Sequence, residues 1–160
     1  MGLELMLGVR NKKESHYGVQ VGFMNESCYP HHVLQMGLYN RTPAGEEYRG
    51  LQTGLFNILN GDAAGVQVGA VNLVDGVVYG LQAGAVNLAN FVGGFQAGVL
   101  NAASLAGVQL GVANGAFGIG AGVQVGLLNF VDAEFNGVQA GVINVALDAG
   151  YNRCFNGVKV

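Results

Sequence analysis

The chain of 160 residues has no tryptophan, only two prolines and few charged residues, and these shortages exclude several classes of protein. Collagen needs abundant proline and a glycine at every third position, and the 28 glycines here do not follow that spacing. Intrinsic disorder needs low hydrophobicity and high net charge, whereas this chain is 51% hydrophobic with a formal net charge of −3. The composition therefore predicts a folded chain.

Basic residues are missing from most of the chain. No lysine or arginine occurs between Arg49 and Arg153, and Asp75 is the single charged residue from 63 to 131. Because nucleic-acid binding depends on basic residues that neutralise phosphates, we expect no nucleic-acid partner. Residues 1–15 also lack the apolar run and the small-residue cleavage site of a secretory signal peptide, which leaves the cellular location unknown.

One hexapeptide, Gln-x-Gly-x-x-Asn, occurs nine times between Gly18 and Asn144. Successive copies are 13 to 17 residues apart, and most are 15 apart. The glutamines are Gln20, Gln35, Gln52, Gln67, Gln82, Gln96, Gln109, Gln124 and Gln139. The asparagines are Asn25, Asn40, Asn57, Asn72, Asn87, Asn101, Asn114, Asn129 and Asn144. Such a short period is typical of a chain built by stacking similar units.

Both ends of the chain look like imperfect copies of the same unit. Near the start, Gly8 and Asn11 keep the repeat spacing, with Met6 in the glutamine position. At the other end, 155–160 echoes 135–140. We therefore expect one repeat domain over 1–160, made of a degenerate N-terminal coil or cap (1–17), nine repeats (18–144) and a partial C-terminal coil (145–160).

The repeat favours strands over helices. Fifteen residues at 100° each would rotate equivalent positions by about 60° per repeat around a helix, and each repeat holds glycines that cost about 1 kcal/mol in a helix interior. Short Val-rich segments bounded by glycine are typical of strands. The sequence predicts an all-β fold, a β-solenoid of about ten coils with two or three short strands per turn. At about 4.8 Å per coil, the rod is about 48 Å long.

Stacking explains why glutamine, glycine and asparagine recur. A buried amide without a partner costs about 1–3 kcal/mol, but amides stacked in successive coils hydrogen-bond to one another. The recurring glycine implies either a positive φ or a corner without room for a Cβ atom. The residues around these positions are apolar on both strand faces, so some apolar side chains must point outward. Whether the amides face inward or outward is left open by the pattern alone.

The core motif resembles the repeat of curli fibre subunits and other bacterial surface-repeat proteins. The resemblance rests on units such as Gln82-x-Gly84-x-x-Asn87-x-Ala89. It implies a strand-arc-strand unit with inward glutamine and asparagine ladders, glycine at the arc, and subunits that add end to end into extracellular fibres. Curli units are longer and carry a serine before the motif, where this chain has Gly76.

Few residues point to catalysis, metals or cofactors. Cys28, His31 and His32 lie close in sequence, but a structural zinc site needs four ligands and no second pair follows. We expect a polar loop at 26–32 and no metal, with these three residues as the weak candidates. Ser104 is the one serine between Gln35 and Asn144, and no histidine follows His32, so we expect no enzyme and no cofactor.

The two cysteines, Cys28 and Cys154, are about eight coils apart. That is roughly 38 Å at 4.8 Å per coil, far beyond the Cα separation of about 7 Å that a disulfide allows. We expect both to be free thiols.

The sequence thus favours a structural or interaction protein whose main partner is itself, as a self-associating fibre subunit or an adhesin-like surface module. A secreted or cell-surface location follows from the resemblance. One alternative is a membrane-associated or membrane-inserted glycine-rich β protein. Gly-x-x-x-Gly recurs as it does in membrane helices, but no run of about 20 residues is free of glutamine and asparagine, so strands of about ten residues would have to span the membrane. Another is a solenoid that binds a periodic ligand such as a polysaccharide.

Overall fold

The structure is a computed structural model. Its described residues are 4–43, 47–105, 107–118, 120–132, 134–147 and 155–160, with side chains at 4, 13–17, 28–33, 105 and 155–157 outside the description. The strands are β1 (Glu4–Met36), β2 (Tyr39–Thr42), β3 (Tyr48–Leu59), β4 (Ala63–Val78), β5 (Leu81–Val92), β6 (Phe95–Leu105), β7 (Val108–Phe117), β8 (Gly120–Asp132), β9 (Phe135–Leu147) and β10 (Phe155–Lys159). No helix occurs among these residues.

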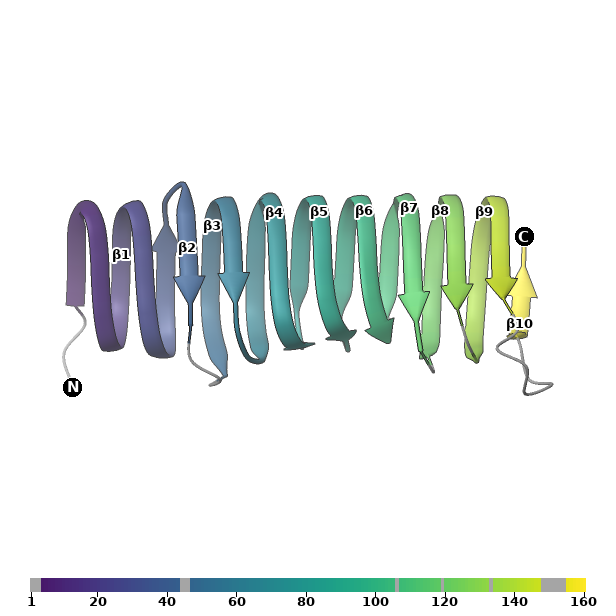
Figure 1. The fold of residues 1–160 in the computed structure, drawn as a ribbon, viewed down its shortest axis with the longest axis horizontal. Coiled ribbons are helices and arrows are strands. Elements are labelled where there is room, and N and C mark those ends of the chain that lie inside the picture. Colours follow the sequence, from purple (N-terminus) through teal and green to yellow (C-terminus); the bar gives the residue numbers. More distant parts are fainter. Residues whose placement is uncertain (1–3, 44–46, 106, 119, 133, 148–154) are drawn as a thin grey trace.

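The chain winds into a β-solenoid, as the repeat predicts. All ten strands belong to one parallel sheet in sequence order, and the two ends of the chain lie at opposite ends of the rod (Figure 1). The nine repeat glutamines span eight full turns, and β1 and β10 add coils at the two ends. A single hydrogen-bonded ladder therefore runs the length of the molecule.

The motif sets the register between coils. Opposite Gln67, Gly69 and Asn72 of β4 lie Gln82, Gly84 and Asn87 of β5, and the other repeats pair in the same way. The interval from Gln35 to Gln52 is two residues longer than the usual 15. The register places the two extra residues after Thr42, between the end of β2 and the start of β3. Differences in coil length thus lie on one edge of the rod, which we call the loop edge, while the opposite edge, the arc, stays uniform.

Two expectations about local structure are wrong. Each coil is mostly one strand that bends around the arc, and the pairing skips a single residue at the bend, such as Ala85 between Gly84 and Val86. The pairing continues because successive bends superimpose. The predicted polar loop at 26–32 lies within β1, because the spacing from Gln20 to Gln35 is the ordinary 15 residues and contains no insertion.

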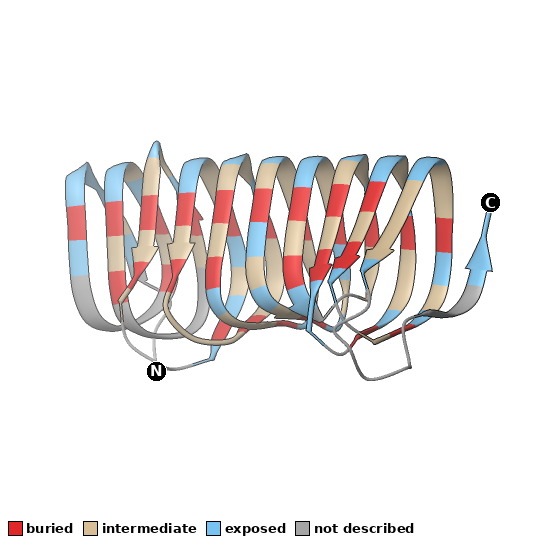
Figure 2. Cartoon of the chain, turned by 45° about the vertical axis from the view of Figure 1, so that its right-hand side comes forward, coloured by how far each residue is buried: buried red, intermediate tan, exposed pale blue. Residues whose placement is uncertain are grey.

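The interior is divided between amides and apolar side chains. Next to the arc, the glutamines and asparagines of the motif are buried, except for Asn144 of the last repeat, which is half-buried. Next to the loop edge, apolar residues such as Tyr48, Leu59 and Val78 form one buried cluster, and Ala116, Val131 and Phe135 form a second. Burial raises the pKa of the Tyr48 phenol, which therefore stays neutral. Figure 2 shows the buried residues recurring at the same places on successive coils.

The glycine two residues after each glutamine marks the closest approach of successive coils. At Gly84, a Cβ atom would collide with the carbonyl oxygen of Gly69 and lie 2.8 Å from Nδ2 of Asn72. The same clash recurs at the equivalent glycine of each coil from Gly22 to Gly141. No positive φ is recorded at these positions. Of the two explanations that the sequence allowed, lack of space is therefore the correct one.

Replacing Gly84 with alanine tests this close approach. The added methyl group forces two coils apart, so Gly84→Ala should lower the free energy of unfolding by about 3 kcal/mol or more, measured by urea titration. Gly93→Ala is the matched control, because Gly93 is exposed on the loop edge and the atoms nearest to its Cβ would belong to the Tyr79 and Phe91 side chains rather than to backbone. That control should lie within about 0.5 kcal/mol of the wild type. Equal losses for the two variants would show that the close approach is not as described.

Candidate functional site

The asparagines of the motif form a continuous buried ladder near the arc. In each coil, Nδ2 donates one hydrogen bond to Oδ1 of the asparagine in the next coil and a second to a backbone carbonyl of that coil. Asn72 illustrates the pattern, with 2.8 Å to Asn87 Oδ1 and 3.0 Å to the Ala83 carbonyl oxygen. Nine asparagine-to-asparagine bonds of 2.7 to 2.9 Å join Asn11 to Asn144. Both protons of each side-chain amide are used, so the ladder holds neighbouring coils together at the arc.

The glutamines form a second ladder whose hydrogen bonds run in the opposite direction. Nε2 of Gln82 donates to Oε1 of Gln67 in the preceding coil at 2.9 Å. Eight bonds of 2.7 to 2.9 Å link Gln20 to Gln139 in this way. The asparagine ladder thus donates toward the C-terminal end and the glutamine ladder toward the N-terminal end. Their dipoles oppose each other, so the amides add little net dipole to the rod.

The first coil extends both ladders, with a methionine in place of the glutamine. Met6 occupies the glutamine position, and its sulfur accepts a hydrogen bond of 3.6 Å from Nε2 of Gln20. Asn11 begins the asparagine ladder by donating to Asn25. Beside it, Lys12 and Arg10 lie 3.1 and 3.9 Å from the Glu26 carboxylate. Met6 and Asn11 are therefore bonded into the same stack as the repeats that follow.

At the other end of the glutamine ladder, Oε1 of Gln139 is buried and accepts no hydrogen bond from the described residues. The register places Lys159 of β10 opposite Gln139, and Val160 closes the asparagine ladder by accepting a bond of 3.0 Å from Asn144. The ladders are therefore a structural element, closed to solvent over most of their length, in which Oε1 of Gln139 is the one ladder oxygen among the described residues that is buried without a donor.

The outside of the arc is apolar. A row of exposed side chains, which we call the arc ridge, lies at the bend itself, three residues after each glutamine and after Met6 in the first coil. It consists of Val9, Phe23, Leu38, Leu55, Ala70, Ala85, Val99, Val112, Leu127 and Val142. Every member is apolar and every member is exposed. Single exposed apolar residues are ordinary, but a contiguous row is typical of an interface.

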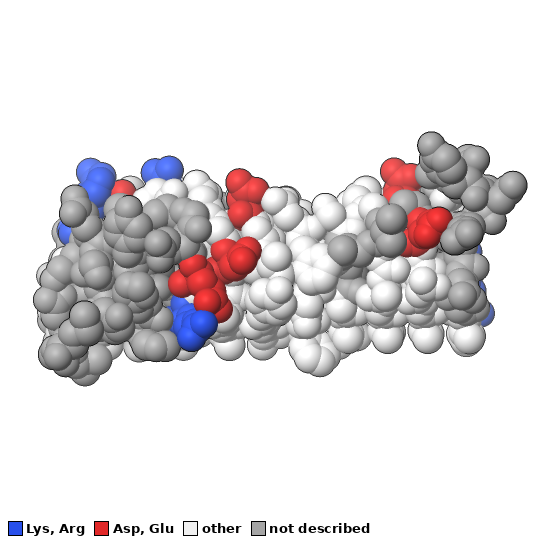
Figure 3. All heavy atoms as spheres, turned by 90° about the horizontal axis from the view of Figure 1, so that it is seen from below, with Lys and Arg blue, Asp and Glu red and all other residues white. Residues whose placement is uncertain are grey.

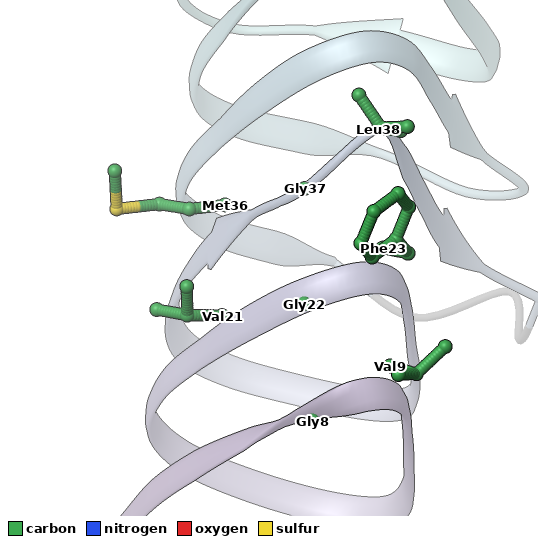
Figure 4. A pocket seen from close by; sticks show the side chains of 8 residues that line it. All are labelled: Gly8, Val9, Val21, Gly22, Phe23, Met36, Gly37 and Leu38. Atoms are coloured by element: carbon green, nitrogen blue, oxygen red, sulfur yellow. The ribbon is translucent and has the colours of Figure 1, made fainter.

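A groove lies beside the arc ridge at its N-terminal end. It has a volume of about 570 Å³ and a floor formed by Gly8, Gly22 and Gly37. Val21 and Met36 line one side, and the ridge residues Val9, Phe23 and Leu38 line the other (Figure 4). The glycine backbone is the lowest part of the arc because it carries no side chain. The lining holds no charged group and offers apolar contacts only.

Charged side chains of the described residues avoid the arc of the central coils. Acidic residues gather toward the loop edge, and Figure 3 shows them separated by uncharged surface. There Asp62 accepts a hydrogen bond from the Val77 backbone, and Asp75 accepts one from Asn90. The hydrogen bond from Arg49 lowers the pKa of the Glu47 carboxyl. Asp62 and Asp75 thus have a structural role, because each bonds to the next coil at the loop edge.

The side chains of Cys28, His31 and His32, the weak candidates for a metal site, lie outside the described part of the structure, and so does residue Cys154. The expected absence of a metal at these residues and of a disulfide between Cys28 and Cys154 therefore stays a prediction. Among the side chains that are described, no three of His, Cys, Asp and Glu lie close enough to hold a metal ion. Within the described residues there is also no helix long and apolar enough to cross a membrane.

Comparison with known proteins adds no relatives: no family model, no curated protein and no solved structure matches the chain. The sequence pattern identified the amide ladders, and the arc ridge was missed as a distinct surface. Its signal is an apolar residue three positions after every glutamine, which only the exposure of those side chains turns into a surface feature.

Removing one ladder amide tests its contribution to stability. Asn87→Ala deletes two donated bonds and leaves the amide of Asn72 without its acceptor. Because a buried unpaired polar group costs about 1–3 kcal/mol, we expect a loss of about 3 kcal/mol or more in the free energy of unfolding, measured by urea titration. Asn90→Ala makes the same change at an exposed position and removes one bond, to Asp75. It should cost less than about 1 kcal/mol. Similar losses would argue against a stabilising ladder.

Proposed function

We propose that this protein is a non-enzymatic structural repeat protein that acts by associating with copies of itself. The observation that carries the proposal is the inverted arrangement at the arc, where amides are buried and large apolar side chains such as Phe23, Leu55 and Leu127 are exposed. Burial of apolar surface is the main driving force of protein association, at roughly 25 cal/mol per Å². In the isolated rod that driving force is unused along the whole arc.

The interior is consistent with the same proposal, because among the described residues it is lined by side chains that bond to or pack against one another. Amide ladders and apolar clusters fill the space between the two layers of each coil. The outer surface is therefore where the molecule meets its partner. A fibre subunit and an adhesin-like surface module are the two forms of this function that the resemblance to surface-repeat proteins suggests.

Sedimentation velocity of the purified chain over a wide concentration range tests the proposal, with negative-stain electron microscopy of the same samples. We expect species larger than the monomer whose share rises with concentration, and rods that are paired, bundled or joined in the images. A chain that stays monomeric at every concentration, seen as separate short rods, would contradict self-association. Light-scattering mass measurement controls for the elongated shape.

A further inference from the structure

We infer that the arc ridge is the contact face between two copies of this chain, which pack side by side with their rods aligned. This inference rests on the proposed function and assigns the surface that performs it. It differs from end-to-end addition, in which the terminal coils make the contact and the arc stays exposed.

The composition of the arc ridge is not required by the fold. A second row of outward positions, three residues before each glutamine, lies toward the loop edge and holds Arg49, Tyr79, Ala121 and Asn136, all exposed. Those positions accept a charge, an amide or an aromatic ring, so an exposed position of a coil tolerates polar residues. The ridge nevertheless holds an apolar residue in all ten coils. A contact that excludes water explains this difference.

The size of the ridge fits an interface between two proteins. Ten coils at about 4.8 Å give a length of about 48 Å, and two layers about 10 Å apart with outward side chains give a width of about 15 Å. The product is roughly 700 Å². Standard interfaces bury about 800 Å² on each partner, so the face is close to what a specific dimer needs. A shorter rod with the same arc would fall well below that size.

The spacing and shape of the ridge favour a second copy over another partner. Apolar side chains recur every 4.8 Å or so along the arc, and another copy necessarily carries the same period. The groove floored by Gly8, Gly22 and Gly37 runs beside the N-terminal part of the ridge. A two-fold related copy places its own ridge in that groove while its groove receives the first ridge, which is the self-complementary arrangement of an isologous dimer. The central arc also carries no charge that would oppose this pairing.

Ala85→Glu tests the inference, with Ala121→Glu as its matched control. Ala85 lies at the centre of the ridge, and Ala121 is an exposed alanine in the row that elsewhere holds Arg49. A glutamate buried in an apolar interface should weaken association about tenfold or more in the sedimentation experiment, whereas the control should associate like the wild type. Ala70→Glu, one coil away on the ridge, provides a second variant in case Ala85→Glu does not fold. Circular dichroism checks the fold of all three.

The outcomes separate the inference from the proposed function. If the wild type associates and neither ridge variant weakens that association, the ridge is not the contact face, although self-association stands. If the wild type is monomeric, both ideas are wrong. Flotation with neutral phosphatidylcholine vesicles completes the test: a monomeric wild type that binds these vesicles, with binding lost in Ala85→Glu, would make lipid the partner of the ridge and overturn the assignment to a second copy.

Discussion

The fold depends on the close contact between identical side chains in successive coils. Asparagine amides bridge coils at 2.7 to 2.9 Å and donate a second bond to the neighbouring backbone. That geometry requires the coils to approach where Gly69 and Gly84 meet, and no larger residue fits there. Glycine therefore permits the approach, and the amides make it favourable. Each intramolecular hydrogen bond contributes about 0.5–1.5 kcal/mol net, so the two ladders together form a large part of the stabilisation along the arc.

The ladders also determine what remains for the surface. A motif that buries glutamine and asparagine beneath the arc leaves its apolar residues no place except outside. Near the loop edge the usual order returns, with Leu59, Val78 and Phe135 buried and Asp75 exposed. The rod is therefore polar inside and apolar outside along one edge, and conventional along the other. This asymmetry is consistent with association through the arc, while the polar loop edge remains in contact with water.

The period of the motif predicts the solenoid and the register, because parallel stacking places equivalent residues opposite each other, as Gln67 and Gln82 lie. Other features of the structure cannot be predicted from the identity of single residues. The two ladders donate in opposite directions, Asn72 toward the C-terminal end and Gln82 toward the N-terminal end, and the spacing of the motif does not encode this. The strands run through the arc because neighbouring bends superimpose. That the amides point inward is seen only in the structure. The repeat is apolar on both strand faces, so the sequence pattern alone is compatible with amides on the inner or the outer face.

The central claim is that the motif amides are buried and bonded to one another, and exchange of side-chain amide protons measures this directly. In deuterium oxide, the nuclear magnetic resonance signals of the Gln82 and Asn87 amide groups should persist long after those of the exposed Asn90 and Asn136 have disappeared, since buried hydrogen-bonded groups exchange only when the structure opens. Equal exchange rates for the two sets would contradict the account, because they would place the repeat amides in solvent and remove the ladders on which the fold depends.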